Sequence, residues 1–380
     1  MKVGVVTRIF GPDIGGGHVV QLAIIGGIRA IKTSHTFFLL DLGKGISCEL
    51  GELPIVDLAR FGETTEKELL ESAIQELGLD VVWFLHPLAE CVSVPFIMTV
   101  WDLQHRRQPY FPEVSVTGWS WPERERAFRA TLPRASRILT GTQAGKNEIL
   151  HFYGVHADNV KVIPIPAPHD ITNQTTLDTA ALRARFGLPE KFLLYPAQFW
   201  PHKNHINLLL ALEELRAKYS LNIALVLTGS DQGNRSHVEE VIQKKQLTHQ
   251  VHLLGLVCRE DLIQLYRCAT ALIFPTFFGP DNIPPLEAFV LGCPVIASRL
   301  SGSEEHLGDA AQLFDPAKPQ EIADAIAAVC GPGYRTVRLR NRLIKKGFKL
   351  ALRRSSPDYV RNVCEILDEF EPVRRCWPTG

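Results

Sequence analysis

The sequence predicts an α/β protein made of two domains, each built on a parallel sheet. Its 380 residues exceed what a single hydrophobic core usually holds. Short apolar runs typical of buried strands alternate with segments of helical periodicity along the whole chain. Between residues 164 and 179, a proline-rich and then polar stretch interrupts this alternation, as a linker between two domains would.

The apolar runs set the strands that we expect, in chain order. In the first domain they are Val3 to Val6, Phe37 to Leu40, Val81 to Leu85, Phe96 to Val100 and Arg137 to Thr140, and the run Val160 to Ile163 precedes the linker. In the second they are Phe192 to Tyr195, Ile223 to Thr228, Val251 to Leu254, Ala271 to Phe274 and Val295 to Ala297, with helices such as Ile206 to Lys218 between them. We place the domains at residues 1–167 and 168–355, followed by a last segment at 356–380 with a helix from Pro357 to Phe370.

The composition narrows the possible functions. Lys and Arg together number 41, as do Asp and Glu, and this balance argues against a chain whose whole surface binds nucleic acid. The eight cysteines show no CxxC or Cys/His ligand spacing, which fits a reducing cytoplasm and gives no sign of a metal site. The chain opens directly with a strand, and its apolar runs are too short for a bilayer. We therefore expect a cytoplasmic protein.

One segment departs from the charge balance. From Arg335 to Arg354 there are nine basic residues and no acid, interleaved with Leu, Ile and Phe. Such a segment is suited to peripheral contact with an anionic membrane at its inner face. A solvated helix face explains it more simply.

The segment from Ala271 to Ser298 is the most informative part of the chain. A strand is followed by a glycine- and proline-rich loop, a helix expected to begin at Pro285, and a second strand. Helix amides at the carboxyl edge of a parallel sheet favour anionic ligands. Glu287, which we place in the first turn, is suited to accept two hydrogen bonds from a ribose diol, or merely to complement the helix dipole.

Ile283 to Ile296 resembles the signature of the retaining nucleotide-sugar glycosyltransferases of family four, the glycosyl transferases group 1, with its Gly-x-Pro-x-Leu-Glu-Ala and Gly-x-Pro-Val patterns. The resemblance implies the GT-B fold: two Rossmann-like, doubly wound domains that face each other across a cleft. The N-terminal domain would lie on the acceptor side and the C-terminal domain would bind the nucleotide sugar. The last helix would cross back to the N-terminal domain.

The chain also departs from that family pattern. The family usually has a second glutamate near the donor sugar, eight positions before Glu287, where this chain has Gly279. The resemblance implies that the loop still offers backbone amides to the donor, with Asp281 or Asn282 as a replacement sugar contact. In this region we expect the donor to contact Gly279, Pro280, Asn282, Ile283, Pro284, Leu286 and Glu287. The resemblance also implies that Val257, in a turn further back in the sequence, lies near the nucleotide base and binds the donor.

A loop after the first strand of the second domain carries the expected cation. Lys203 lies close to the start of a helix, where its charge would neutralise a diphosphate. The family commonly has an arginine five residues earlier, where this chain has Gln198, which we assign to donor binding. His202 is a possible sugar contact, and His205 is a further candidate, although loop histidines more often cap or pack.

Two segments of the first domain are expected to contribute. Gly15, Gly16 and Gly17 follow the first strand and can present successive amides as an anion nest, and the family has a glycine pair at this turn, over the donor diphosphate or acceptor. A plain flexible turn is the alternative. After the strand that ends at Val100, Trp101 occupies the position of a family histidine near the donor sugar, and Asp102 that of an aspartate.

Three further aromatic or ionisable residues follow in the same region. His105 is a substitute for the missing histidine, while Asp102 is almost equally suited to cap the following turn. Trp119 and Trp121 have the flat rings that sugar acceptors favour, and a buried aromatic core explains them about as well.

The resemblance implies a reaction in which a hexosyl unit moves, with retention, from a GDP- or UDP-sugar, such as GDP-mannose, to a glycan or lipid-linked acceptor in surface polysaccharide or glycoconjugate biosynthesis. We assign catalytic roles to Lys203, Asp102 and Asp281. The chain has no Asp-x-Asp pair, so neither a metal nor a cofactor is expected. A nucleotide-sugar epimerase of the same build, or a catalytically degenerate nucleotide-sugar-binding protein, remains an alternative.

Overall fold

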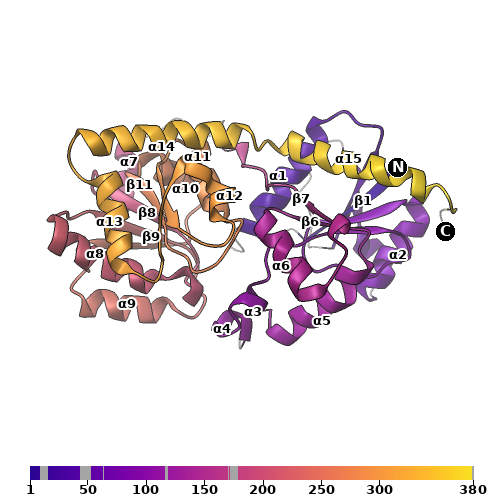
Figure 1. Cartoon of the computed structure of the whole chain (residues 1–380), viewed down its shortest axis with the longest axis horizontal. Helices are drawn as coiled ribbons and strands as arrows, with labels where there is room; N and C mark the ends of the chain where they lie inside the picture. The colour runs from indigo at the N-terminus through magenta and orange to yellow at the C-terminus, as the bar shows by residue number, and fades with distance from the viewer. Residues whose placement is uncertain are drawn as a thin grey trace. The chain divides into compact units, whose positions relative to one another are not determined.

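The computed structural model describes residues 1–8, 16–42, 53–62, 64–115, 119–169, 171 and 179–378. Its contacts divide the chain into two compact units (Figure 1). Unit 1 comprises Met1–Tyr110, Val114–Pro166 and Arg354–Gly380, and unit 2 comprises Phe111–Glu113 and Ala167–Arg353. Each unit is an α/β layer structure around one parallel sheet, so the predicted fold class is confirmed.

Unit 1 contains a seven-stranded sheet in the order β3-β2-β1-β4-β5-β6-β7, in which every pair is parallel. The strands are β1 Lys2–Thr7, β2 Thr36–Asp41, β3 Ile55–Asp57, β4 Val81–Phe84, β5 Phe96–Thr99, β6 Arg137–Thr140 and β7 Val160–Val162. Edge strand β3 was not predicted, because three residues are too short to show a periodicity. The helices are α1 Gly16–Ala30, α2 Glu66–Leu77, α3 Gln104–Arg107, α5 Trp121–Thr131, α6 Gln143–Tyr153 and α15 Ser356–Arg374, and α4 Pro112–Ser115 lies where the two units meet in the sequence.

Helix α15 packs against α1 within unit 1. Ser355 caps its start by accepting a hydrogen bond from the Asp358 amide. The two helices approach closely at Gly27, where an added Cβ would lie 2.4 Å from the carbonyl oxygen of Ser356. A glycine is therefore required at this crossing.

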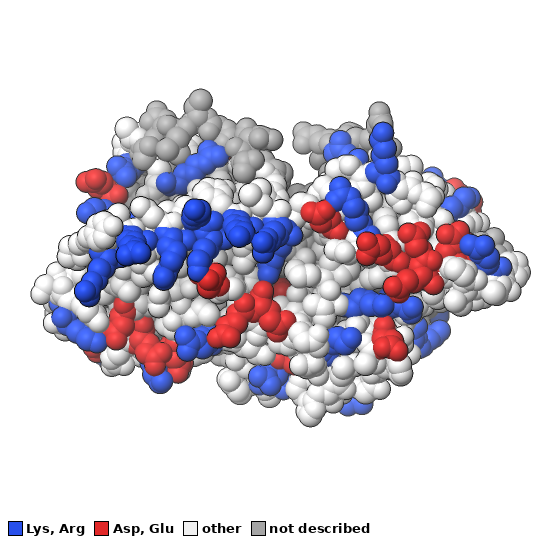
Figure 2. Space-filling view, turned by 45° about the horizontal axis from the view of Figure 1, so that its top comes forward, with Lys and Arg blue, Asp and Glu red and all other residues white. Residues whose placement is uncertain are grey.

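Unit 2 contains a six-stranded parallel sheet in the order β10-β9-β8-β11-β12-β13. The strands are β8 Phe192–Pro196, β9 Ala224–Thr228, β10 Val251–Gly255, β11 Ala271–Phe274, β12 Val295–Ser298 and β13 Ala311–Phe314, of which β13 was not predicted. The helices are α7 Thr179–Phe186, α8 His205–Tyr219, α9 Arg235–Lys244, α10 Arg259–Cys268, α11 Ile283–Val290, α12 Ser303–Leu307, α13 Pro319–Cys330 and α14 Tyr334–Leu352. Lys and Arg side chains form a row on the surface along α14 (Figure 2).

The strand orders place a switch point in each sheet, where the chain reverses its direction of strand addition. In unit 2 the switch point lies between β8 and β11, and in unit 1 between β1 and β4. Open α/β sheets bind ligands at the carboxyl ends of the strands at such points. A ligand site is therefore expected in the loops that follow these four strands.

Candidate functional site

The two loops at the switch point of unit 2 are joined by hydrogen bonds. Both the Phe277 amide (2.8 Å) and the Thr276 hydroxyl (3.2 Å) donate to the carbonyl oxygen of His202. The Lys203 ammonium lies 5.5 Å from the ring centroid of Phe274, the last residue of β11. The structure thus brings Lys203 beside the loop that leads into α11.

Three hydrogen bonds hold Lys203 and the next residue in place. The Tyr195 hydroxyl donates to the Lys203 carbonyl oxygen at 2.6 Å. The next residue, Asn204, has a left-handed backbone with φ 60°, a conformation that asparagine tolerates better than most residues. Its buried amide nitrogen donates to the carbonyl oxygens of Pro275 and Pro316, both at 2.8 Å. These bonds orient the start of α8, two residues after Lys203.

Glu113 is a residue of this site that sequence reasoning missed. Its buried carboxylate accepts hydrogen bonds from the His202 ring at Nδ1 and from the His202 amide at 3.1 Å. Burial alone would raise the pKa of Glu113, but the hydrogen bond from His202 holds it below its ordinary value. Since 89 residues separate the two, no local pattern in the sequence points to the contact. His202, predicted as a sugar contact, is buried and engaged with Glu113.

The loop before α11 has a backbone at position 279 that disfavours the glutamate of the family pattern. Gly279 has φ +117°, and an added Cβ would lie 2.4 Å from the side-chain oxygen of Asn282. The Asn282 amide nitrogen in turn donates to the Gly279 carbonyl oxygen. Glycine at 279 and the folded-back Asn282 side chain are therefore one local arrangement.

The side chains predicted to replace that glutamate are turned toward the protein. The Asp281 side chain is only 7% exposed, with Oδ1 3.8 Å from Nδ1 of His306. The same histidine ring bonds through Nε2 to the Asn282 carbonyl oxygen at 2.8 Å. Asn282 bonds to its own loop. In this conformation both side chains are engaged within unit 2. Sequence reasoning also missed His306.

Helix α11 begins two residues earlier than predicted. It starts at Ile283, with both prolines in its first turn, because proline tolerates the early helical positions, where its missing N–H needs no partner. Glu287 is therefore in the second turn, and its predicted first-turn position is wrong. The simple dipole interpretation of this carboxylate also loses its basis.

Glu287 is 4% exposed and has two partners inside unit 2. One carboxylate oxygen accepts a hydrogen bond from the Arg259 guanidinium at 2.5 Å, and the other from the Tyr266 hydroxyl at 2.7 Å. Burial, followed by the nearby carboxylate, raises the pKa of Tyr266 well above its ordinary value, so this hydroxyl keeps its proton. A carboxylate offers about four acceptor positions, and the Arg259 side chain is 30% exposed. The carboxylate points into the protein but lies next to an exposed guanidinium.

The ends of β8 and β9 also approach each other closely. Gln198 donates to the Ser230 hydroxyl at 3.2 Å and accepts from the Trp200 indole at 3.0 Å. An added Cβ at Gly229 would lie 2.3 Å from the Ala197 carbonyl oxygen. Sequence reasoning did not select Gly229 or Ser230, although a Gly-Ser pair directly after a strand was an available signal. Val257 is half-buried in the turn between β10 and α10.

At the switch point of unit 1, Trp101 packs on the first turn of α1. An added Cβ at Gly17 would lie 2.8 Å from the Trp101 ring. Gly16 and Gly17 are helical in the structure, not part of a loop nest, and Gly15 lies outside the described residues. His86, which sequence reasoning missed, follows β4 and contacts the Trp101 ring edge-on at 5.5 Å. Burial, and secondarily Arg8, lowers its pKa to about 3, so this ring is neutral at pH 7.

The other candidates of unit 1 have partners inside that unit. Asp102 accepts a hydrogen bond from the Gln104 amide at 2.9 Å, which matches the turn-capping alternative. His105 is completely buried against Phe128, with Nε2 3.1 Å from the Tyr153 hydroxyl. This burial contradicts its assignment as a sugar contact.

Trp119 and Trp121 are half-buried and lie under guanidinium groups. Arg124 lies 4.9 Å from the Trp119 ring centroid, and Arg106 lies 5.5 Å from that of Trp121. Trp119 also packs against Phe128 and the core of unit 1. Both rings fit the alternative of a packed aromatic cluster better than that of an open acceptor platform.

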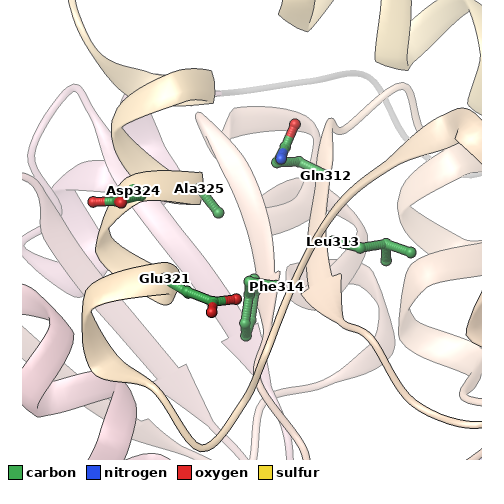
Figure 3. Close-up of a pocket in the computed structure, with 6 residues that line it drawn as sticks. All are labelled: Gln312, Leu313, Phe314, Glu321, Asp324 and Ala325. Carbon is green, nitrogen blue, oxygen red and sulfur yellow. The ribbon is translucent and has the colours of Figure 1, made fainter.

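A small cavity of about 220 Å³ lies elsewhere in unit 2, between β13 and α13 (Figure 3). It is lined by Gln312, Leu313, Phe314, Glu321, Asp324 and Ala325, none of which is a candidate from the sequence. Over the described part of the chain, no three His, Cys, Asp or Glu side chains gather as metal ligands would. Within the same residues, no helix combines the length and apolar character needed to span a bilayer.

The chain has recognisable relatives. Residues 179–350 match the family described as glycosyl transferases group 1. Over 205 residues the chain is 26% identical to O-antigen chain mannosyltransferase B of Escherichia coli, covering 54% of this chain and 53% of that protein. Over 326 residues it is 24% identical to the serotype-specific mannosyltransferase WbdA of Escherichia coli, covering 81% of this chain and 40% of that protein. The chain thus spans about half or less of these relatives.

The fold also resembles solved structures. The crystal structure of Anabaena HepE in complex with UDP and glucose matches with a TM-score of 0.74 and 18% identity, covering 97% of this chain and all (100%) of that one. At 18% identity this match supports the fold alone.

Proposed function

We propose that this chain moves a hexosyl unit, with retention, from a nucleotide-diphosphate sugar to a glycan or lipid-linked acceptor, because residues 179–350 match the glycosyl transferases group 1 and the chain has the GT-B fold. Surface polysaccharide or glycoconjugate biosynthesis is the proposed setting. GDP-mannose is the first donor to test, since two relatives are named mannosyltransferases. UDP-glucose is the second.

The observation that carries the proposal is the junction of two loops at the switch point of unit 2. The carbonyl oxygen of His202, in the loop after β8, accepts hydrogen bonds from Thr276 and Phe277 in the loop after β11, and Lys203 lies beside the loop that leads to α11. A leaving diphosphate needs positive charge and backbone amides that are already oriented when the sugar bond breaks. In the proposed site Lys203 would supply the charge, and the backbone amides of Gly279, Asp281, Asn282 and Ile283 would supply the donors, since the prolines among them have no N–H. The roles of Asp102 and Asp281 stay predictions.

Glu287 keeps its proposed role as the acceptor for the ribose hydroxyls. Two of its acceptor positions are occupied by Arg259 and Tyr266, and the remaining ones would take the diol. The bond from the Arg259 guanidinium fixes the orientation of this carboxylate. Arg259 and Tyr266 would thus act by holding Glu287, and the ribose would bind at the exposed edge of this group.

A donor screen tests the proposal directly. The protein is incubated with GDP-mannose, UDP-glucose and related donors over a panel of soluble glycan acceptors, and release of nucleoside diphosphate is measured. We expect release that depends on an acceptor. Donor turnover into an epimer without acceptor would instead indicate the epimerase. Donor binding without release over the whole panel would indicate the degenerate binding protein, which the changes at Gly279, Gln198 and Trp101 favour.

Replacing Lys203 tests the proposed electrostatic role. We expect Lys203→Ala to lower kcat by about a hundredfold or more, the scale of losing one preorganised donor, while Lys203→Arg retains part of the activity. The exposed Lys191→Ala in the same unit is the control and should match wild type. Unchanged turnover by a folded Lys203→Ala protein would rule out this role.

A further inference from the structure

Helix α14 has an inner face that is packed against the helix carrying Glu287. Gly347 allows this contact, since an added Cβ there would lie 2.5 Å from the Phe289 ring of α11. Leu343 and Ala351, one turn to either side, are buried as well. The opposite face of α14 lies on the surface of unit 2 (Figure 2). Helix α14 therefore contacts the helix that carries Glu287 with one face and is exposed to solvent on the other.

The outer face of α14 is strongly basic. Its exposed basic side chains recur every three to four residues: Arg335, Arg338, Arg342, Lys345, Lys349 and Arg353. The neighbouring Lys346 pairs with Asp309, whereas Arg338, Lys345 and Lys349 form no ion pair within the described residues. These charges follow a row along the helix (Figure 2). Asp309 also interacts with Arg342, so it offsets part of this charge, but the six basic side chains outnumber it.

The same face exposes large apolar side chains between the charges. Tyr334 is 79% exposed, Leu352 71% and Phe348 42%. Single exposed apolar side chains are common on protein surfaces, but here three of them lie on one helix beside a row of basic side chains. A mixture of basic and apolar residues on one exposed face is what a helix needs in order to lie in the interface of a bilayer. The exposures thus favour the lipid interpretation of this segment over the solvated one.

We propose that the outer face of α14, defined by the six basic residues above with Tyr334, Phe348 and Leu352, binds the surface of an anionic lipid bilayer. Lipid phosphates would meet the basic side chains, and the apolar side chains would enter the headgroup region. The inference rests on the proposed function for its purpose, because a lipid-linked acceptor lies in such a bilayer. The binding itself is independent of catalysis and is measured separately.

Flotation with vesicles tests the contact. Wild type should float with vesicles containing about one third phosphatidylglycerol in phosphatidylcholine, should float far less with phosphatidylcholine alone, and should be released by high salt. The variant Arg338→Glu, Lys345→Glu, Lys349→Glu should bind at least about tenfold more weakly, since each basic residue near such a surface strengthens binding about fivefold. The triple variant Tyr334→Ser, Phe348→Ser, Leu352→Ser should bind the vesicles more weakly. High salt should still release the binding that remains.

The control carries the same charge change elsewhere in unit 2. Lys191, Arg216 and Lys244 are exposed and lie outside α14, and their triple change to Glu should leave vesicle binding within about twofold of wild type. Equal binding by both triple variants, or no preference of wild type for anionic vesicles, would overturn the proposal. So would binding to duplex DNA in place of vesicles.

Thermal shifts with nucleoside diphosphates separate this inference from the proposed function. All variants should keep the shift of wild type, because none touches the candidate donor site. A protein that binds vesicles through α14 but releases no nucleoside diphosphate from any donor would refute the proposed function and leave the membrane contact standing.

Discussion

Gly279 shows how one residue determines the shape of the candidate donor loop. Its positive φ strains any larger residue, and the Asn282 side chain above it would have to move to admit one. We expect Gly279→Ala to lower the free energy of unfolding by about 1–3 kcal/mol, since backbone strain and a steric clash add. Denaturant titration measures this change.

Gly62 provides the matched control for that substitution. It has φ +113° and no atom within 4 Å of an added Cβ, so Gly62→Ala reports the backbone strain without the clash. Gly279→Ala should be the more destabilising of the two. Equal losses would mean that Asn282 moves aside freely and that the loop accepts a side chain at 279.

The buried ring of His205 should make the stability of the protein depend on pH. The ring is buried and stacked 4.7 Å from Phe199, and neither nitrogen has a hydrogen-bond partner among the described residues. Burial, then Lys203 and His202, lowers its pKa from 6.5 to about 3. Between these values the unfolded chain binds a proton that the folded chain does not. The contribution of His205 to stability is therefore lost as the pH falls below about 6.5.

Replacing His205 by an apolar ring removes this pH-dependent loss. The free energy of unfolding of His205→Phe, relative to that of wild type, should rise by about 1–2 kcal/mol as the pH falls from about 7.5 to about 5. Urea titrations at both pH values measure the difference, with the exposed His249→Phe as a control that shows no gain. A constant difference between His205→Phe and wild type would mean that the buried ring does not resist protonation.

At the scale of elements, the sequence predicted the strands that have several apolar residues in a row. It missed β3 and β13, the outermost strands at one edge of each sheet, and misplaced the start of α11. Short edge strands carry little periodicity, and two prolines after Asn282 are compatible with either start. The signature around Glu287 pointed to the family whose model matches residues 179–350, but the partners of that residue come from α10, which no motif indicates.

The contact between α10 and α11 rests on the buried carboxylate of Glu287. Tyr266→Phe removes the hydroxyl that donates to it, so a buried oxygen loses one partner. We expect the free energy of unfolding to fall by about 1–3 kcal/mol. Tyr219 donates to Asp324 from an exposed position, so Tyr219→Phe should change it by less than about 0.5 kcal/mol. Denaturant titration compares the two, and equal effects would argue against an important buried bond.

At the scale of the whole molecule, the sequence indicated two parallel-sheet domains but not the contacts that complete the site. Glu113 reaches His202 from 89 residues away, and His306 reaches the loop before α11 from the segment after β12. Such contacts depend on the folded path of the chain, which local periodicity does not encode. For the same reason, the burial of His105 could not be predicted from its position after a strand.

The C-terminal helix provides the last prediction, because α15 leaves unit 2 in the sequence and packs within unit 1. Gly27→Ala would force the Ser356 carbonyl away from α1, whereas an added Cβ at the adjacent Gly26 meets no atom within 4 Å. We expect Gly27→Ala to lower the Tm of unit 1 by a few degrees, and Gly26→Ala to raise it slightly through helix propensity. Calorimetry with and without nucleoside diphosphate measures both, because the ligand should shift only the transition of unit 2. If Gly27→Ala instead lowers the ligand-shifted transition, then α15 supports unit 2 and the two units do not unfold independently.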